Sequence, residues 1–189
     1  MSARNFGPSS PGKGPRVEIV TFDRFTDVTG VDAIVNPANP WLEGPWGGLN
    51  AVVWTAAGVS ELRGALRVIK KKQLQNSRGK LPVGEAVLTS SYGIGKRGGG
   101  RARYIIHTVG PDLRFGIPMA KATRLLHKCY QNSLDLLVEN GLESIVGVEC
   151  ARLVICKAIS GLLSHIHWHL RLSCGIWLLK KRPKQWPNG

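Results

Sequence analysis

Residues 31–58 read VDAIVNPANPWLEGPWGGLNAVVWTAAG, and they carry in turn the patterns of a strand, a loop and a helix. Its apolar start, Val31–Val35, suits a short strand buried in a parallel or mixed sheet. A polar, glycine-rich loop follows, and apolar residues then recur at nearly helical spacing from Asn50 to Leu66, with Gly58 as an interruption. The stretch therefore predicts a buried strand, a glycine-rich loop and a helix that Gly58 can break.

The chain alternates in the same way as far as residue 148. Strand-like runs lie at 17–22, 85–89, 104–109 and 142–148, an amphipathic helix is predicted over 120–140, and the basic stretch 70–80 is expected to be solvated. Because strands and helices alternate, we predict an α/β fold with helices layered on a mixed, mostly parallel sheet. Residues 1–16 are rich in Gly, Pro and Ser, which predicts a disordered N-terminal arm.

Composition limits the classes of partner. With 189 residues the chain is long enough for one compact domain, which we expect to be a monomer, and its formal net charge of +14 favours anionic partners such as nucleotides and nucleic acids. Four cysteines without a CxxC spacing, and the lack of a signal-peptide pattern, favour an intracellular location, cytoplasmic or nuclear. The longest apolar run, 158–170, is too short to span a bilayer, so no membrane segment is expected.

Three further motifs follow the glycine-rich loop. They are Gly-Glu-Ala at 84–86, Ile-His-Thr-Val-Gly-Pro at 106–111, and Cys-Tyr-Gln-Asn-Ser-Leu at 129–134. In this order and spacing, and together with Asn-Pro-Ala-Asn at 36–39, they resemble the macro domain, an α/β module that binds ADP-ribose. The resemblance implies a three-layer α/β/α fold over residues 17–148.

The resemblance also implies a set of ligand contacts. A glycine-rich loop that leads into a helix offers backbone N–H groups to a diphosphate. By similarity, the adenine would meet a carboxylate just after the first strand, with Asp23 as the candidate and Asp27 as the second choice. Asn39 would contact the distal ribose, while Asn36 would brace the loop. The candidate ligand-binding residues are Asp23, Asn36, Asn39, Gly44, Gly47, Gly48 and Leu49.

Simpler interpretations exist for the polar residues of this set. Asn and Asp are common at strand ends because their side chains bond nearby backbone groups, so turn chemistry alone explains such positions. His107 is expected to be a strand histidine that is hydrogen-bonded inside the domain, with no catalytic role. No metal or cofactor is implied, because the histidines at 165, 167 and 169 match no standard zinc spacing.

The chain departs from the family pattern at the position that bears on catalysis. In the branch of the family that hydrolyses ADP-ribosyl groups, an aspartate follows the glycine cluster and helps to activate water. Asn50 stands there instead, and an amide cannot act as a carboxylate base. Asn39 and Asn50 are the candidate catalytic residues, with Asn50 the weaker. Within the loop, Pro45 removes an N–H donor and Trp46 adds bulk where the family has glycine.

The C-terminal segment departs further. Residues 149–189 are basic and show no clear strand periodicity, so the last βα units of the domain are expected to be altered or missing. The run Ala158–Gly161 resembles the second phosphate loop of the family only weakly. This pattern would fit an alternative splice product or an unrelated tail in place of the end of the domain.

Several functions are compatible with these patterns. The first is a binding module for ADP-ribose or mono-ADP-ribosylated proteins, and the second is a hydrolase that removes ADP-ribose from acidic side chains or deacetylates O-acetyl-ADP-ribose. A third is weak binding of nucleic acid through the basic runs at 70–72, 96–103 and 180–184. A fourth is a truncated isoform that binds nothing well.

Overall fold

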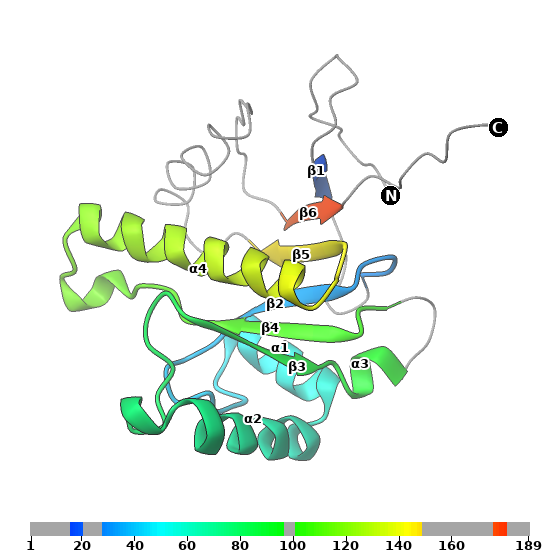
Figure 1. Cartoon of the computed structure of the whole chain (residues 1–189), viewed down its shortest axis with the longest axis horizontal. Coiled ribbons are helices and arrows are strands. Elements are labelled where there is room, and N and C mark those ends of the chain that lie inside the picture. The colour runs from blue at the N-terminus through cyan, green and yellow to red at the C-terminus, as the bar shows by residue number, and fades with distance from the viewer. Residues whose placement is uncertain (1–15, 21–27, 97–100, 149–175, 181–189) are drawn as a thin grey trace.

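The computed structural model describes residues 16–20, 28–96, 101–148 and 176–180. Within them the chain forms a six-stranded sheet with the order β1-β6-β5-β2-β4-β3 (Figure 1). The central strand β2 is parallel to both of its neighbours, β4 and β5, whereas β3 is antiparallel to β4 and β6 is antiparallel to β5 and β1. Four of these strands therefore run in one direction, which confirms the predicted mixed, mostly parallel sheet.

The elements have the following bounds. The strands are β1 Arg16–Val20, β2 Ala33–Pro37, β3 Ala86–Ser90, β4 Tyr104–Thr108, β5 Ser144–Val148 and β6 Ile176–Lys180. The α-helices are α1 Gly48–Ala57, α2 Val59–Gln73, α3 Gly93–Lys96 and α4 Met119–Glu139, and short 3-10 turns lie at Gln75–Ser77 and Leu113–Phe115.

Sequence patterns located most of these elements to within two residues. The predicted helix over 50–66 is in fact two helices, because Gly58 takes a φ of 99° and separates α1 from α2. The second helix also continues past Leu66 to Gln73, so the first part of the stretch that we expected to be merely solvated is helical. The amphipathic helix predicted over 120–140 is α4.

Helices cover both faces of the sheet, as the predicted three-layer arrangement requires. In Figure 1, α1 and α2 lie on one side and α4 on the other. The alternation of side chains along β2 and β4 supplies both cores, because neighbouring residues of a strand point to opposite faces. Ile34 and Ile105 belong to the core shared with α1 and α2, while Ala33 and Ile106 belong to the core shared with α4.

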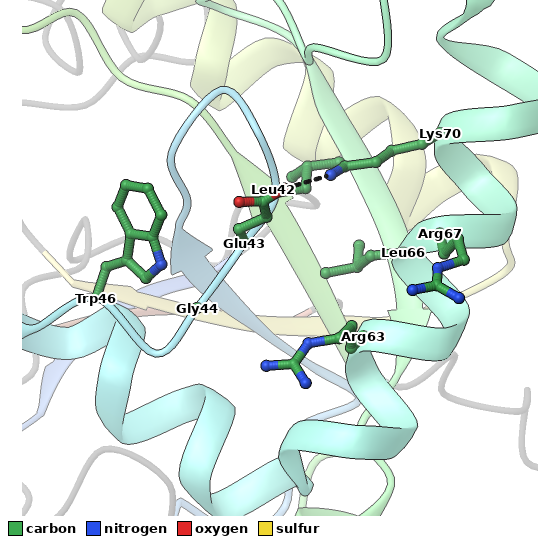
Figure 2. A pocket seen from close by; sticks show the side chains of 8 residues that line it. All are labelled: Leu42, Glu43, Gly44, Trp46, Arg63, Leu66, Arg67 and Lys70. Carbon is green, nitrogen blue, oxygen red and sulfur yellow. Dashed lines mark hydrogen bonds and ion pairs between the residues drawn. The ribbon is translucent and has the colours of Figure 1, made fainter.

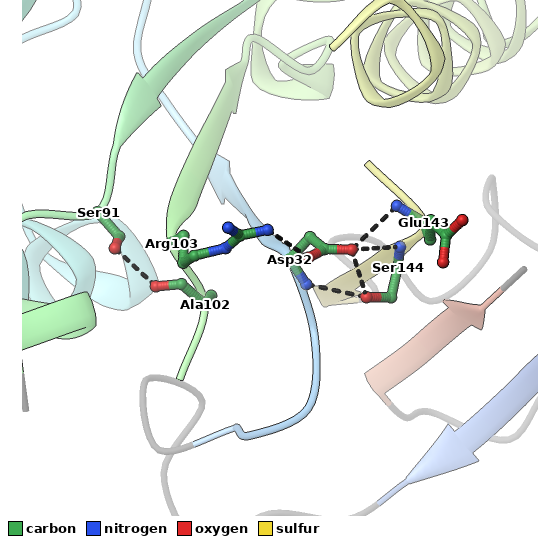
Figure 3. A network of polar contacts seen from close by, with 6 residues as sticks. All are labelled: Asp32, Ser91, Ala102, Arg103, Glu143 and Ser144. Atoms are coloured by element: carbon green, nitrogen blue, oxygen red, sulfur yellow. Dashed lines mark hydrogen bonds and ion pairs between the residues drawn. The ribbon is translucent and has the colours of Figure 1, made fainter. Parts of the chain in front are cut away.

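The carboxylate of Asp32 joins the start of β2 to the start of β5 (Figure 3). Its Oδ2 atom accepts from the backbone N–H groups of Glu143 and Ser144, at 2.9 and 3.1 Å, and from the Ser144 hydroxyl at 2.9 Å. Its Oδ1 atom pairs with the Arg103 guanidinium at 3.1 Å. Burial opposes ionisation of this carboxyl, but the bonds from Glu143, Ser144 and Arg103 outweigh it and lower the pKa of Asp32 below its ordinary value.

The strand β6 is the main difference from the sequence-based expectation. It comes from the segment 149–189, in which the sequence shows no clear strand periodicity, yet Ile176–Lys180 pairs with β5 on one side and β1 on the other. Its four consecutive apolar residues, Ile176–Leu179, carry no alternation, and this segment becomes a strand through the partners on either side. Arg16, which the sequence placed in a disordered arm over 1–16, is the first residue of β1; residues 1–15 lie outside the described part of the chain.

No helix in the described part of the chain is long and apolar enough to cross a membrane.

Candidate ligand-binding site

The loop between β2 and α1 is shaped by the side chain of Asn39. The Asn39 Oδ1 atom accepts from the backbone N–H groups of Trp41 and Glu43, at 3.1 and 3.3 Å, and its Nδ2 atom donates to the carbonyl of Glu43 at 2.5 Å. The amide therefore folds the loop back upon itself, in the manner of an Asx turn. Asn39 is half-buried at the base of this turn.

A buried polar network lies beneath the loop. Asn36, at 0% exposure, uses its Nδ2 atom to donate to Asn50 Oδ1 and to His107 Nδ1, each at 3.0 Å. The second ring nitrogen, His107 Nε2, lies 2.9 Å from the Thr89 hydroxyl. Because an amide NH₂ can only donate, this arrangement makes Nδ1 the acceptor and leaves the proton on Nε2. The network connects β2, β3 and β4 with the first turn of α1.

His107 is held neutral by its surroundings. Its ring is fully buried, and the loss of solvation lowers the pKa of His107 from 6.5 to about 3. The prediction that this residue is a hydrogen-bonded strand histidine inside the domain is confirmed by its bonds to Asn36 and Thr89.

Gly44 is a glycine for reasons of packing. A Cβ atom at this position would lie 2.7–2.8 Å from the ring of Trp54, which is itself 1% exposed in the core. The loop backbone thus lies directly on the buried indole, and the peptide bond between Gly44 and Pro45 is cis. A side chain at position 44 would push the loop off α1.

Gly47 and Gly48 are glycines for a different reason. They have φ values of 95° and 56°, which an L side chain rarely adopts, and no atom lies within 4 Å of where a Cβ would be on either residue. Gly47 is the N-cap of α1 and Gly48 is its first residue, and no side chain caps this helix. The N-terminus of α1, which carries a positive dipole end, therefore opens through bare backbone onto free space. Leu49 follows, half-buried, and Asn50 lies beneath it.

The structure brings most of the candidate ligand contacts together on one loop. Asn39, Gly44 and Gly47 lie between β2 and α1, and Gly48 and Leu49 are the first two residues of α1. Asn36 and Asn50 are buried, with their side chains bonded to one another. The other candidates, Asp23 and Asp27, lie outside the described residues, as do the run 158–161 and the histidines at 165, 167 and 169. Within the described residues, no group of three His, Cys, Asp or Glu side chains is placed to hold a metal ion.

A pocket that the sequence did not predict adjoins this loop (Figure 2). It measures about 220 Å³, and the residues that line it are Leu42, Glu43, Gly44, Trp46, Arg63, Leu66, Arg67 and Lys70. Gly44 is the one candidate residue that it shares with the set from the sequence. The sequence does hold one indication of this pocket. Arg63, Arg67 and Lys70 are spaced by four and three residues along a helix, so they share one face.

Comparison with known proteins agrees with this arrangement of strand, glycine loop and helix. Residues 35–149 match the family described as Macro domain. The chain belongs to the macro domain family. The match covers more than half of the chain and runs from the middle of β2 through β5.

Relatives in this family carry names that refer to ADP-ribose. The chain is 39% identical over 132 residues to an O-acetyl-ADP-ribose deacetylase of Citrobacter rodentium. The aligned residues cover 69% of this chain and 64% of that protein. It is 39% identical over 115 residues to the ADP-ribose glycohydrolase MACROD1 of Mus musculus, covering 61% of this chain and 30% of that protein. The chain thus spans less than two thirds of the length of each of these relatives.

Solved structures show the same fold. A macrodomain of Oceanobacillus iheyensis with ADP is 28% identical and superposes with a TM-score of 0.60 over 81% of this chain and 80% of that one. A variant of the same macrodomain with ADPR is 30% identical, with a TM-score of 0.58 over 77% of this chain and 75% of that one. The likeness therefore extends over most of both chains.

Proposed function

We propose that this chain binds ADP-ribose, either free or attached to a protein, at the loop that joins β2 to α1. Membership of the macro domain family supports this proposal, as do the names of its relatives and the ADP and ADPR present in similar macrodomains. The unit responsible would be the macro-like domain of residues 17–148, acting as a monomer and without a metal or cofactor.

The observation that carries the proposal is the backbone at Gly47 and Gly48. Two consecutive exposed residues with positive φ and open space at their Cβ positions lie at the start of α1, and no side chain caps its first N–H groups. Free N–H groups at a helix N-terminus, together with the dipole of the helix, favour a phosphate or diphosphate group. The diphosphate of ADP-ribose would therefore lie across this point.

The neighbouring residues then take separate roles. Asn36 and Asn50 would brace the loop from beneath, because their side chains are buried and bonded to each other. Asn39 would hold the shape of the turn and present its amide to the distal ribose, and Leu49 would pack against the ligand. Asp23 would accept a hydrogen bond from the adenine amino group.

Calorimetric titration with ADP-ribose tests the proposal, with Gly48→Ala as the variant. A methyl group at this position would occupy the space in front of the α1 N-terminus, and we expect binding to weaken by about tenfold or more, which corresponds to about 1.4 kcal/mol. The matched control is Gly116→Ala, because Gly116 also has a positive φ, of 67°, and open space around its Cβ position. Equal affinity of the two variants, or no binding by the folded native chain, would refute the proposal.

A second candidate function is hydrolysis of an ADP-ribosyl bond. The relatives named as a deacetylase and a glycohydrolase favour it. Against it, the amide of Asn50 is directed inward to Asn36 and to the carbonyl of Glu43, and it holds no charge with which to activate water. We therefore place binding ahead of turnover.

An intracellular location, in the cytoplasm or the nucleus, is also part of the proposal. The cysteine pattern supports it, and the basic run at 180–184 is compatible with nuclear entry.

A further inference from the structure

The basic pocket beside the glycine loop contains more cations than it can pair. Arg63, Arg67 and Lys70 line it from α2, and Glu43 is the one acidic residue in the lining. In Figure 2, Lys70 reaches Glu43 and Arg63 extends toward the loop at Gly44, while Arg67 lies beside α2. Glu43 pairs with Lys70 at 3.2 Å. Within the described part of the chain, the guanidinium groups of Arg63 and Arg67 make no ion pair or hydrogen bond, so the pocket holds two uncompensated positive charges.

The structure of the helix does not account for Arg63 and Arg67. Cations stabilise the last turn of a helix through the dipole, which explains Lys70, Lys71 and Lys72 at the end of α2. Arg63 and Arg67 lie in the middle of that helix, where the dipole gives no benefit, and like charges four residues apart repel each other slightly. Both residues are exposed, as on an ordinary basic face, and both also line the pocket.

The opposite wall of the pocket is aromatic. Trp46 is 64% exposed and stacks on Trp41, with ring centroids 6.2 Å apart and planes inclined by 27°. Lys80 lies over the other ring, 5.2 Å from the Trp41 centroid, and so helps to hold the pair in place. Between the two walls, Leu42 and Leu66 form an apolar floor. The lining thus contains one exposed indole ring and two guanidinium groups.

We infer that this pocket binds a nucleoside monophosphate, with its phosphate between Arg63 and Arg67 and its base against Trp46. Guanidinium groups suit phosphate because they offer several donors in a planar fork, and every nucleobase has a face that stacks on an aromatic side chain. This site adjoins the proposed ADP-ribose site at Gly44 but uses neither the α1 N-terminus nor the asparagines. It is therefore independent of the proposed function.

Titration of the full chain with uridine 5′-monophosphate tests the inference, since this probe lacks adenine. We expect saturable binding that weakens by about tenfold in Arg63→Gln and again in Arg67→Gln, because a hydrogen bond to a charged group contributes enough for such a factor. The matched control is Arg124→Gln, which removes the same charge from the exposed surface of α4, on the other side of the sheet (Figure 1). The control is expected to bind as the native chain does.

Two further arms of the experiment separate the possible results. Trp46→Leu should weaken binding of the nucleotide but leave binding of inorganic phosphate unchanged. Gly48→Ala, which is designed to obstruct the ADP-ribose site, should bind uridine 5′-monophosphate normally, so that the two proposals can fail separately. The inference is overturned if the folded native chain does not bind the nucleotide, if Arg124→Gln weakens it as much as Arg63→Gln, or if inorganic phosphate binds as tightly as the nucleotide.

Discussion

The Nδ2 atom of Asn36 donates to the Oδ1 atom of Asn50 at 3.0 Å, and this buried bond ties the end of β2 to the first turn of α1. The same nitrogen donates to His107 Nδ1, so the Asn36 amide links β2 to both α1 and β4. Asn36 was expected to brace the loop, and its buried side chain lies beneath the loop backbone in a position to do so.

Replacing Asn36 with alanine should destabilise the domain substantially. The change would leave Asn50 Oδ1 and His107 Nδ1 buried without a donor, and each unpaired group costs about 1–3 kcal/mol. We expect the free energy of unfolding in urea to fall by about 2–4 kcal/mol. Asn140→Ala is the control, because the Asn140 side chain makes one exposed bond, to the Leu136 carbonyl, and its loss should cost less than about 0.5 kcal/mol. An equal loss in the free energy of unfolding for the two variants would show that the buried bonds of Asn36 do not stabilise the domain.

His107 should make the stability of the domain depend on pH. Its pKa is lowered from 6.5 to about 3, so below pH 6.5 the unfolded chain binds a proton that the folded chain does not. Stability is therefore fully present above pH 6.5 and declines as pH falls toward 3, by about 1.4 kcal/mol per unit. Between pH 7 and pH 5 we expect a loss of about 2 kcal/mol that the His107→Gln variant does not show. Parallel stability curves for the two proteins would rule out a buried neutral imidazole.

Asp32 should be needed to hold β5 against β2. Asp32→Ala removes the acceptor for Ser144 and for the Glu143 backbone, and we expect a loss of about 2 kcal/mol of stability and faster hydrogen exchange in β5. Because the pKa of Asp32 is lowered, the native chain should also lose this contribution as pH falls below about 4. Asp112→Ala is the control, because Asp112 bonds only within an exposed turn, with Arg114. Unchanged hydrogen exchange in β5 of the Asp32→Ala variant would show that the Asp32 carboxylate does not hold β5 in place.

Periodicity predicted the strand, loop and helix of the front half because each of these elements carries its own local signal. The apolar run Val31–Val35, the positive-φ glycines and the break at Gly58 all depend on residues that are neighbours in sequence. β6 carries no such signal, because pairing with strands far away in the chain makes it a strand. Sequence patterns alone could not place it.

The candidate site was predicted only in part, because some of its features depend on contacts between residues that are distant in sequence. The resemblance to the macro domain identified the loop residues, but which asparagine is buried depends on the packing of α1 on β2, which brings Asn50 to Asn36. The basic pocket depends on how α2 lies relative to the loop at Glu43 and Trp46, about twenty residues earlier in the chain. Helical spacing places three cations on one face of α2 but does not show what that face meets.

The last prediction concerns turnover and the amide of Asn50. This side chain is 9% exposed, accepts from Asn36, and directs its Nδ2 atom toward the carbonyl of Glu43 at 3.5 Å. Asn50→Asp would keep the bond from Asn36 but bring a carboxylate oxygen up to that carbonyl, so we expect a loss of about 1–2 kcal/mol of stability.

If the missing acid is all that limits catalysis, release of ADP-ribose from a protein modified on glutamate should rise by about a hundredfold, the lower range for general acid–base catalysis. Asn50→Ala, which removes the amide without adding an acid, should give no such rise. A folded Asn50→Asp variant that binds ADP-ribose yet releases none would show that the chain is a binding module whose chemistry is absent at more than this one position.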